Sequence, residues 1–174
     1  LSIRRQRQMC IRDRVMLCTC STIGGGADLA RHPTVSVLRV DRPMAQAAVA
    51  AGKRILLAAC LESTVEPTRQ LLLGEGTGLE IEALLIPEAW PHWVAGSKNE
   101  YWSAIAKRIA ERIGEFDSVV LAQASMAGAA QLLSHCDVPV LSSPRSGVAE
   151  AIGRLNVKPR SDTNAPELPS AIGD

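Results

Sequence analysis

Residues 15–28 (VMLCTCSTIGGGAD) constrain the fold more than any other stretch of the chain. A short apolar run ends in small polar residues and is followed by three glycines. This order predicts a buried strand, a tight turn and a helix N-terminus. In an open α/β sheet, such a turn faces the crevice at the carboxyl end of the strand, where ligands bind. Cys20, Ser21 and Thr22 are therefore candidates for thiol chemistry and anion binding.

Strands alternate with helices along the rest of the chain, which predicts an α/β fold with parallel sheets. Of the 174 residues, 47% are hydrophobic but only 3% are aromatic, and such aliphatic runs suit parallel strands covered by helices on both faces. Strands are predicted at residues 15–20, 35–40, 55–60, 79–86, 117–121 and 138–141. Helices are predicted at residues 24–31, 44–51, 66–73, 98–113, 127–133 and 146–155, and an ordered loop at residues 87–96.

Charge and cysteine content argue against several classes of protein. The net charge is +1 without a strongly basic or acidic block, so neither nucleic acid nor an anionic membrane is an expected partner. No apolar run reaches the ~18 residues that are needed to cross a bilayer. The odd number of cysteines, five, favours reduced thiols in the cytoplasm over a disulfide framework, and their spacing does not suit zinc.

The two ends of the chain differ from its regular middle. Residues 1–14 hold five arginines without strand alternation or an apolar helical face, and they look like translated adapter sequence joined to a truncated reading frame. A disordered basic leader and a nucleic-acid-binding arm are the alternatives. We predict that this non-native or disordered leader can be deleted without a change in melting temperature. Residues 156–174 are rich in proline and polar residues and are predicted to form a loose tail.

Small polar residues also follow two later strands. Ser63 and Thr64 follow the strand at residues 55–60, and Gln123, Ala124 and Ser125 follow the strand at residues 117–121. The hydroxyl groups could simply cap the helices that come next. Alternatively, free N–H groups at the same helix ends would bind a carboxylate.

Three further features are expected to be structural. The glycines at residues 24–26 are not followed by Lys-Ser/Thr, so a phosphate-binding loop is not indicated. Cys60 lies at the end of an apolar run and is predicted to be in the core. Arg42 beside Asp41 is interpreted as part of a helix cap at the surface.

The order of these motifs resembles the aspartate/glutamate/hydantoin racemase superfamily. Cys20-Ser21-Thr22 matches the first cysteine motif of that family, Cys-Asn/Ser-Thr, and Thr64 lies where the family has a substrate-binding threonine after a strand. Residues 120–127 (VLAQASMA) are similar to the second motif in its hydantoin racemase form, Val-Leu-Gly-Cys-Ala-Gly-Met-Ala. The resemblance covers roughly residues 15–155.

The resemblance implies two similar parallel-sheet halves related by a pseudo-two-fold axis, with the first strand and helix missing from this chain. Residues 15–60 would form a partial first half and residues 61–141 the second half. Residues 142–155 would be a helix that returns to the first half.

The resemblance also implies an activity. Members of the family hold two cysteines on opposite faces of the substrate Cα, and one thiolate removes the proton while the other thiol returns it. This chain would be a racemase-like isomerase that acts without cofactor or metal on a small carboxylate or hydantoin-like substrate, with Cys20 as the acid–base group. The substrate-binding residues would be Ser21, Thr22, Ser63, Thr64, Gln123, Ala124 and Ser125.

The chain departs from the family at Gln123, which stands at the position of the second cysteine. A glutamine amide is neither an acid nor a base near neutral pH, whereas a thiol can be tuned into that range. Racemisation with two bases is therefore in doubt. The alternatives are a single-cysteine decarboxylase or lyase of the same superfamily and a non-catalytic binding protein for small acids. The sequence is compatible with a homo-oligomer as well as with a monomer.

Overall fold

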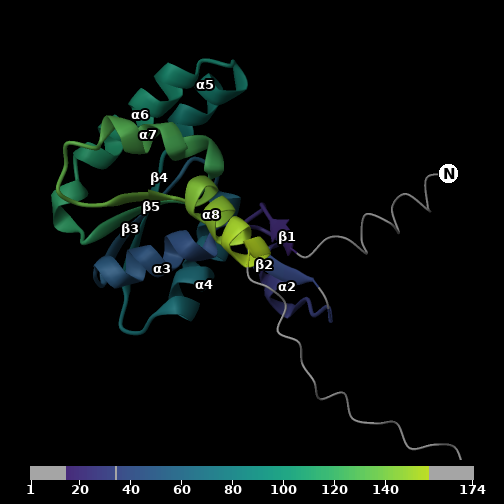
Figure 1. The fold of residues 1–174 in the computed structure, drawn as a ribbon. Coiled ribbons are helices and arrows are strands. Elements are labelled where there is room, and N and C mark those ends of the chain that lie inside the picture. The colour runs from purple at the N-terminus through teal and green to yellow at the C-terminus, as the bar shows by residue number, and fades with distance from the viewer. Residues whose placement is uncertain (1–14, 34, 157–174) are drawn as a thin grey trace, which may run out of the picture.

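The computed structural model of the chain describes residues 15–33 and 35–156. The predicted leader and all but the first residue of the predicted tail lie outside these residues. Within them, the chain is an α/β protein with two parallel sheets (Figure 1), which confirms the predicted fold class at this level. None of the helices in the described ranges is long and apolar enough to span a membrane.

The larger sheet has four parallel strands in the order β4–β3–β5–β6. Its strands are β3 (Arg54–Ala59), β4 (Glu80–Leu85), β5 (Ser118–Leu121) and β6 (Val140–Ser142). Residues 55–59 of β3 and all of β5 are buried, as expected for strands that are covered on both faces. The connection from β3 leads to one side of the sheet and the connection from β5 to the other. The carboxyl ends of β3 and β5 therefore flank a switch point, where sheets of this kind bind ligands.

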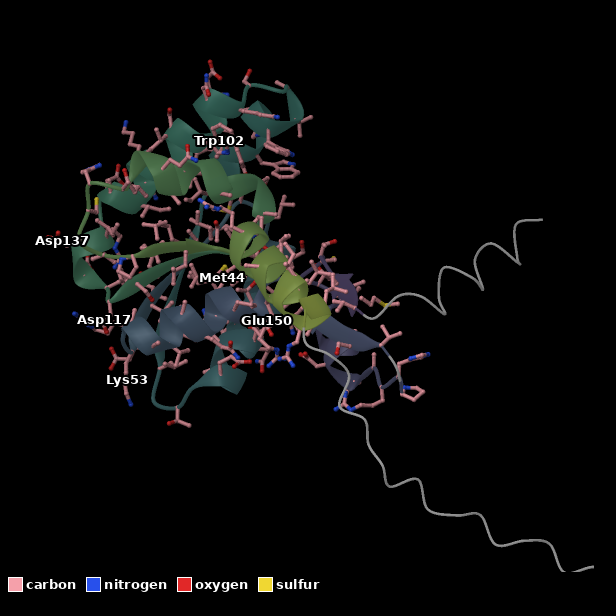
Figure 2. All side chains as sticks on the ribbon, viewed as in Figure 1. Met44, Lys53, Trp102, Asp117, Asp137 and Glu150 are labelled. Carbon is pink, nitrogen blue, oxygen red and sulfur yellow. The ribbon has the colours of Figure 1, made fainter. Side chains whose placement is uncertain are left out.

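The side chains of β3 alternate between two apolar layers. Leu56 and Ala58 pack with α6 (Lys98–Ala110) and α7 (Ala127–Leu132). Ile55 and Leu57 pack on the opposite face with α3 (Arg42–Ala51) and α4 (Val65–Glu75). Trp102 accordingly lies on the α6 side of the sheet and Met44 on the α3 side (Figure 2).

A separate sheet of two parallel strands is formed by β1 (Val15–Cys18) and β2 (Ser36–Arg39), which α2 (Gly24–Leu29) connects. The change from one sheet to the other falls between β2 and β3. β3 is thus a strand of the larger sheet, although the predicted first half extends to residue 60.

The last helix, α8 (Ser143–Asn156), joins the two sheets. It begins directly after β6 and contacts β1, β2 and α3 (Figure 1). A β-carbon at Gly147 would collide with the carbonyl oxygen of Val40, the residue that follows β2. Glycine therefore lets α8 pack backbone to backbone against the end of β2.

Some predicted boundaries are wrong. The predicted loop at residues 87–96 contains a 3-10 turn, Pro87–Ala89, and the short helix α5 (Trp90–Val94). Pro91 is compatible with this helix because it occupies the first turn, where an N–H group has no partner in any case. The strand predicted at residues 15–20 ends at Cys18, and α6 ends at Ala110 instead of residue 113. The predicted helix at residues 146–155 begins three residues earlier, at Ser143.

Candidate functional site

A cavity of about 240 Å³ lies at the carboxyl edge of the strands. Its wall comes from the segments that follow β1, β2, β3, β5 and β6. The predicted site residues in this wall are Cys20, Ser21, Thr22, Thr64, Gln123 and Ala124. The wall also includes Thr19, Val40, Asp41, Ala122 and Ser143, which were not predicted as site residues. The cavity is smaller than the roughly 300–1,000 Å³ of pockets for drug-sized ligands, so it suits a small molecule.

A larger hollow of about 550 Å³ lies at the opposite edge, near the amino ends of β3 and β4. Three of its four charged lining residues form ion pairs: Glu82 and Glu115 bind Arg112, and Arg54 binds Asp117. Asp117 also accepts the N–H groups of Lys53 and Arg54 at 2.9 Å, near where Figure 2 labels Lys53 and Asp117. Most charged side chains at this edge thus form ion pairs within the protein, whereas the wall of the smaller cavity contains the exposed thiol of Cys20.

Cys20 is exposed in the turn between β1 and α2. The N–H groups of Ile23 and Thr22, together with the Thr22 hydroxyl, donate to its sulfur and lower the pKa of the thiol. Partial desolvation and, more weakly, the carboxylate of Asp41 act in the opposite direction but do not cancel this effect on the pKa. A lowered pKa increases the thiolate fraction near neutral pH, and thiolate is the basic and nucleophilic form. Cys20 is therefore accessible, and its pKa is shifted in the direction that favours the thiolate.

Cys60 is the opposite kind of thiol. It is 2% exposed, and burial raises its pKa, against a weaker lowering by the hydrogen bond from Tyr101. The predicted core position of Cys60 is confirmed. Cys18 is half-buried, and its thiol donates to the carbonyl oxygen of Cys20 at 3.6 Å.

Gln123 spans the switch point between β5 and β3. Its Oε1 accepts the backbone N–H groups of Cys60 at 2.7 Å and of Leu61 at 3.1 Å. These two donors fix which end of the amide is oxygen, so Nε2 takes the other direction. Nε2 has no hydrogen-bond partner among the described residues. Because every fully buried side-chain nitrogen or oxygen in these residues has a partner, Nε2 is not fully buried. Gln123 lines the cavity, and its Nε2 is a donor that no other described residue uses.

The predicted hydroxyl residues are divided between the cavity and the scaffold. Thr64 lies in the cavity wall, but its hydroxyl donates to the carbonyl oxygen of Leu61 at 2.8 Å. The hydroxyl of Ser125 lies 2.9 Å from that of Tyr101, and its carbonyl oxygen accepts the indole N–H of Trp102. Ser125 is thus held toward α6, and Ser63 is exposed; neither is a residue of the cavity wall.

Asp41 is the carboxylate of the cavity wall. It occupies the residue before α3 but makes no side-chain cap, because both of its oxygens accept Arg39 at 2.9 Å. Arg39 is 6% exposed and also binds Asp28 at 3.0 Å. A β-carbon at Gly24 would collide with this guanidinium, which gives the first glycine of the GGG run a packing role. Arg42 binds Asp28 and Glu75 and does not point into the cavity.

Sequence reasoning missed Asp41 and Ser143 as residues of the site, although both carry a recognisable signal. Each is a small polar residue that directly follows a strand region and stands within two residues of a proline. That pattern marks a helix start, and at the carboxyl edge of a parallel sheet a helix start also faces the ligand crevice.

The described residues contain no group of three or more His, Cys, Asp or Glu side chains that could hold a metal ion. Fold and cavity together define an α/β protein with a small-ligand cavity at the carboxyl edge of its strands. No protein-family model matches the chain, and a search of curated proteins found no significant match.

Proposed function

We propose that this protein is a racemase-like isomerase that transfers a proton at the carbon next to a carboxylate or carbonyl group of a small acid. Cys20 is its acid–base group. One observation supports this above all: turns that lie far apart in the sequence bring Cys20, Thr64 and Gln123 to the wall of one cavity. In this proposal the cavity lies where two related α/β halves face each other, as in the family that the sequence resembles.

The thiolate of Cys20 takes the proton from the substrate carbon, and the electron pair moves onto the neighbouring carboxylate or carbonyl oxygen. Hydrogen-bond donors must meet the charge that develops there. Gln123 lines the cavity with an amide whose Nε2 is not used by another described residue, and this amide does not titrate near neutral pH. This observation favours the single-cysteine form of the chemistry, in which Cys20 returns a proton to the same face of the carbon. Exchange without racemisation, or decarboxylation followed by protonation, would result.

The test is proton NMR of exchange at Cα in deuterated water with a panel of amino acids, hydantoins and substituted malonates. The Cys20→Ser variant should lose about 10²–10⁴-fold in exchange rate, the usual contribution of a positioned acid–base group. Cys18→Ser is the matched control, because Cys18 lies on the same segment outside the cavity wall, and it should retain exchange. Full exchange in Cys20→Ser would refute the role of Cys20. No exchange by the wild type with any compound would favour the non-catalytic binding protein.

A further inference from the structure

Several hydrogen-bond donors around the cavity are already engaged within the protein. The N–H groups of Ile23 and Thr22 and the Thr22 hydroxyl serve the sulfur of Cys20. The hydroxyl of Thr64 donates to its own turn. These donors are therefore not available to the oxygens of a bound acid.

Two side-chain donors remain free on the β5 and β6 side of the cavity. One is Gln123 Nε2, which two backbone donors orient through Oε1. The other is the hydroxyl of Ser143. This residue lines the cavity and is only 5% exposed. This hydroxyl has no hydrogen-bond partner among the described residues. Every fully buried side-chain oxygen in these residues has a partner, so the Ser143 hydroxyl is not fully buried. Ser143 therefore presents an unused donor to the cavity.

The position of Ser143 in the fold adds to this donor pair. It is the first residue of α8, a helix of 14 residues, and the N–H groups of a first helical turn have no partner inside the helix. The helix dipole also favours a negative charge at this end. The contact of Gly147 with Val40 fixes the start of α8 against the end of β2, which borders the same cavity.

We infer that Ser143 Oγ, Gln123 Nε2 and the first turn of α8 form a carboxylate subsite. This inference rests on the proposed function, since the carboxylate bound there belongs to the acid whose α-carbon faces Cys20. The lining residues include no lysine, arginine or histidine, so hydrogen bonds and the helix terminus supply the attraction. The wall carboxylate, Asp41, is held by two hydrogen bonds from Arg39.

Binding of methylmalonate to the full chain tests the subsite, with NMR shifts of the Gln123 side-chain amide and the α8 first-turn amides as the readout. Ser143→Ala should raise the dissociation constant about tenfold or more, because hydrogen bonds to charged groups are strong. Ser146→Ala is the matched control in the same helical turn. Its hydroxyl contacts the carbonyl oxygens of Ser142 and Ser143 at 3.5 and 3.4 Å, so the affinity should not change. The uncharged diamide of methylmalonate should bind more weakly than the acid.

Gln123→Glu is a second variant with the same shape. A glutamate still accepts the N–H groups of Cys60 and Leu61, but its second oxygen replaces the donor and adds a negative charge. Methylmalonate binding should weaken by about 100-fold or more, since like charges would then face each other. Wild-type affinity in both Ser143→Ala and Gln123→Glu would overturn the subsite, and so would failure of methylmalonate to bind the wild type.

Failure of the subsite and failure of the proposed function give different results. Exchange that depends on Cys20, together with unchanged affinity in Ser143→Ala, would leave the function standing without this subsite. Methylmalonate binding that depends on Ser143, with no exchange for any compound, would support the subsite and refute the activity.

Discussion

The turns after β1 and β5 both follow parallel strands and both line the cavity, but they use hydrogen bonds in opposite directions. In the turn after β1, the backbone N–H groups of Thr22 and Ile23 donate to the side chain of Cys20 and favour its charged form. In the turn after β5, the side chain of Gln123 accepts backbone N–H groups from the loop after β3. The first arrangement favours the thiolate form of Cys20, and the second fixes the orientation of a neutral amide. Two turns that line one cavity therefore differ in the chemistry they can support.

The largest expected effect is on proton exchange, when the turn after β5 is given a thiol like that of the turn after β1. Gln123→Cys places a thiol at the end of β5, where the proposed mechanism has no second base. Because the thiol also replaces a donor of the carboxylate subsite, KM should rise; at saturating substrate, exchange of the opposite enantiomer should rise by about 10²–10⁴-fold, and the product should lose optical purity. Deuterium incorporation and optical rotation, followed together, measure this change.

Gln123→Ser is the control for this substitution, because serine is similar in size to cysteine but does not titrate near neutral pH. It should not bring about racemisation. If Gln123→Cys exchanges a single enantiomer as the wild type does, the end of β5 does not face the substrate carbon.

The next largest effect is expected in α8, which packs against β1, β2 and α3 and begins in the cavity wall. Gly147→Ala puts a methyl group against the carbonyl oxygen of Val40 and should lower the free energy of unfolding by about 1–3 kcal/mol. Gly153→Ala is the matched control in the same helix, because a β-carbon there meets nothing within 4 Å. It should raise the stability by about 0.5–1 kcal/mol, the helix preference of alanine over glycine. Urea unfolding measures both, and equal effects would show that α8 does not approach β2 this closely.

A smaller loss of stability is expected from Gln123→Ala, which removes the acceptor of two backbone N–H groups after β3. Unfolding by urea should show a loss of about 1–2 kcal/mol, since these donors are left without a protein partner. Gln123→Glu keeps an acceptor in place and should lose less. Equal stability of Gln123→Ala and the wild type would indicate that water replaces the amide oxygen.

The sequence was sufficient to predict the parallel strands and the cavity-facing turns, because these depend on local patterns. An apolar run that ends in Cys20 or Gln123 carries its own signal for a strand and a turn. The direction of each side chain was not predictable, because it depends on partners distant in the sequence. Gln123 is oriented by Cys60 and Leu61, and Ser125 is drawn away from the cavity by residues of α6.

Asp41 shows the same limit. The helix cap interpreted at Asp41 and Arg42 does lie at the start of α3, but the Asp41 carboxylate binds Arg39 instead of capping the helix. A buried guanidinium on the preceding strand outcompetes the helix N–H groups for those oxygens, because two parallel hydrogen bonds between opposite charges are stronger than a bond to a neutral N–H group. A local motif therefore predicts where a polar residue lies better than which group it binds.

The smallest expected effect is a shift in the pH dependence of Cys20. Because donors from the turn lower the pKa of this thiol, alkylation by iodoacetamide should reach half its maximal rate at a lower pH in the native chain than in urea. The folded state then binds fewer protons between the two midpoints. This contribution to stability is present above the unfolded pKa and is lost as the pH falls through the folded pKa.

Mass spectrometry assigns the modified site in this experiment, and Cys60 should react only after unfolding because it is buried. Thr22→Ala removes the hydroxyl donor but keeps both N–H groups, so the native midpoint should rise slightly. Thr19→Ala is the control, since Thr19 lies in the same wall but does not contribute to the pKa of Cys20. A native midpoint equal to that in urea would mean that the turn after β1 does not activate its thiol. The turns after β1 and β5 would then differ only in carrying a cysteine or a glutamine, and not in how their hydrogen bonds tune that residue.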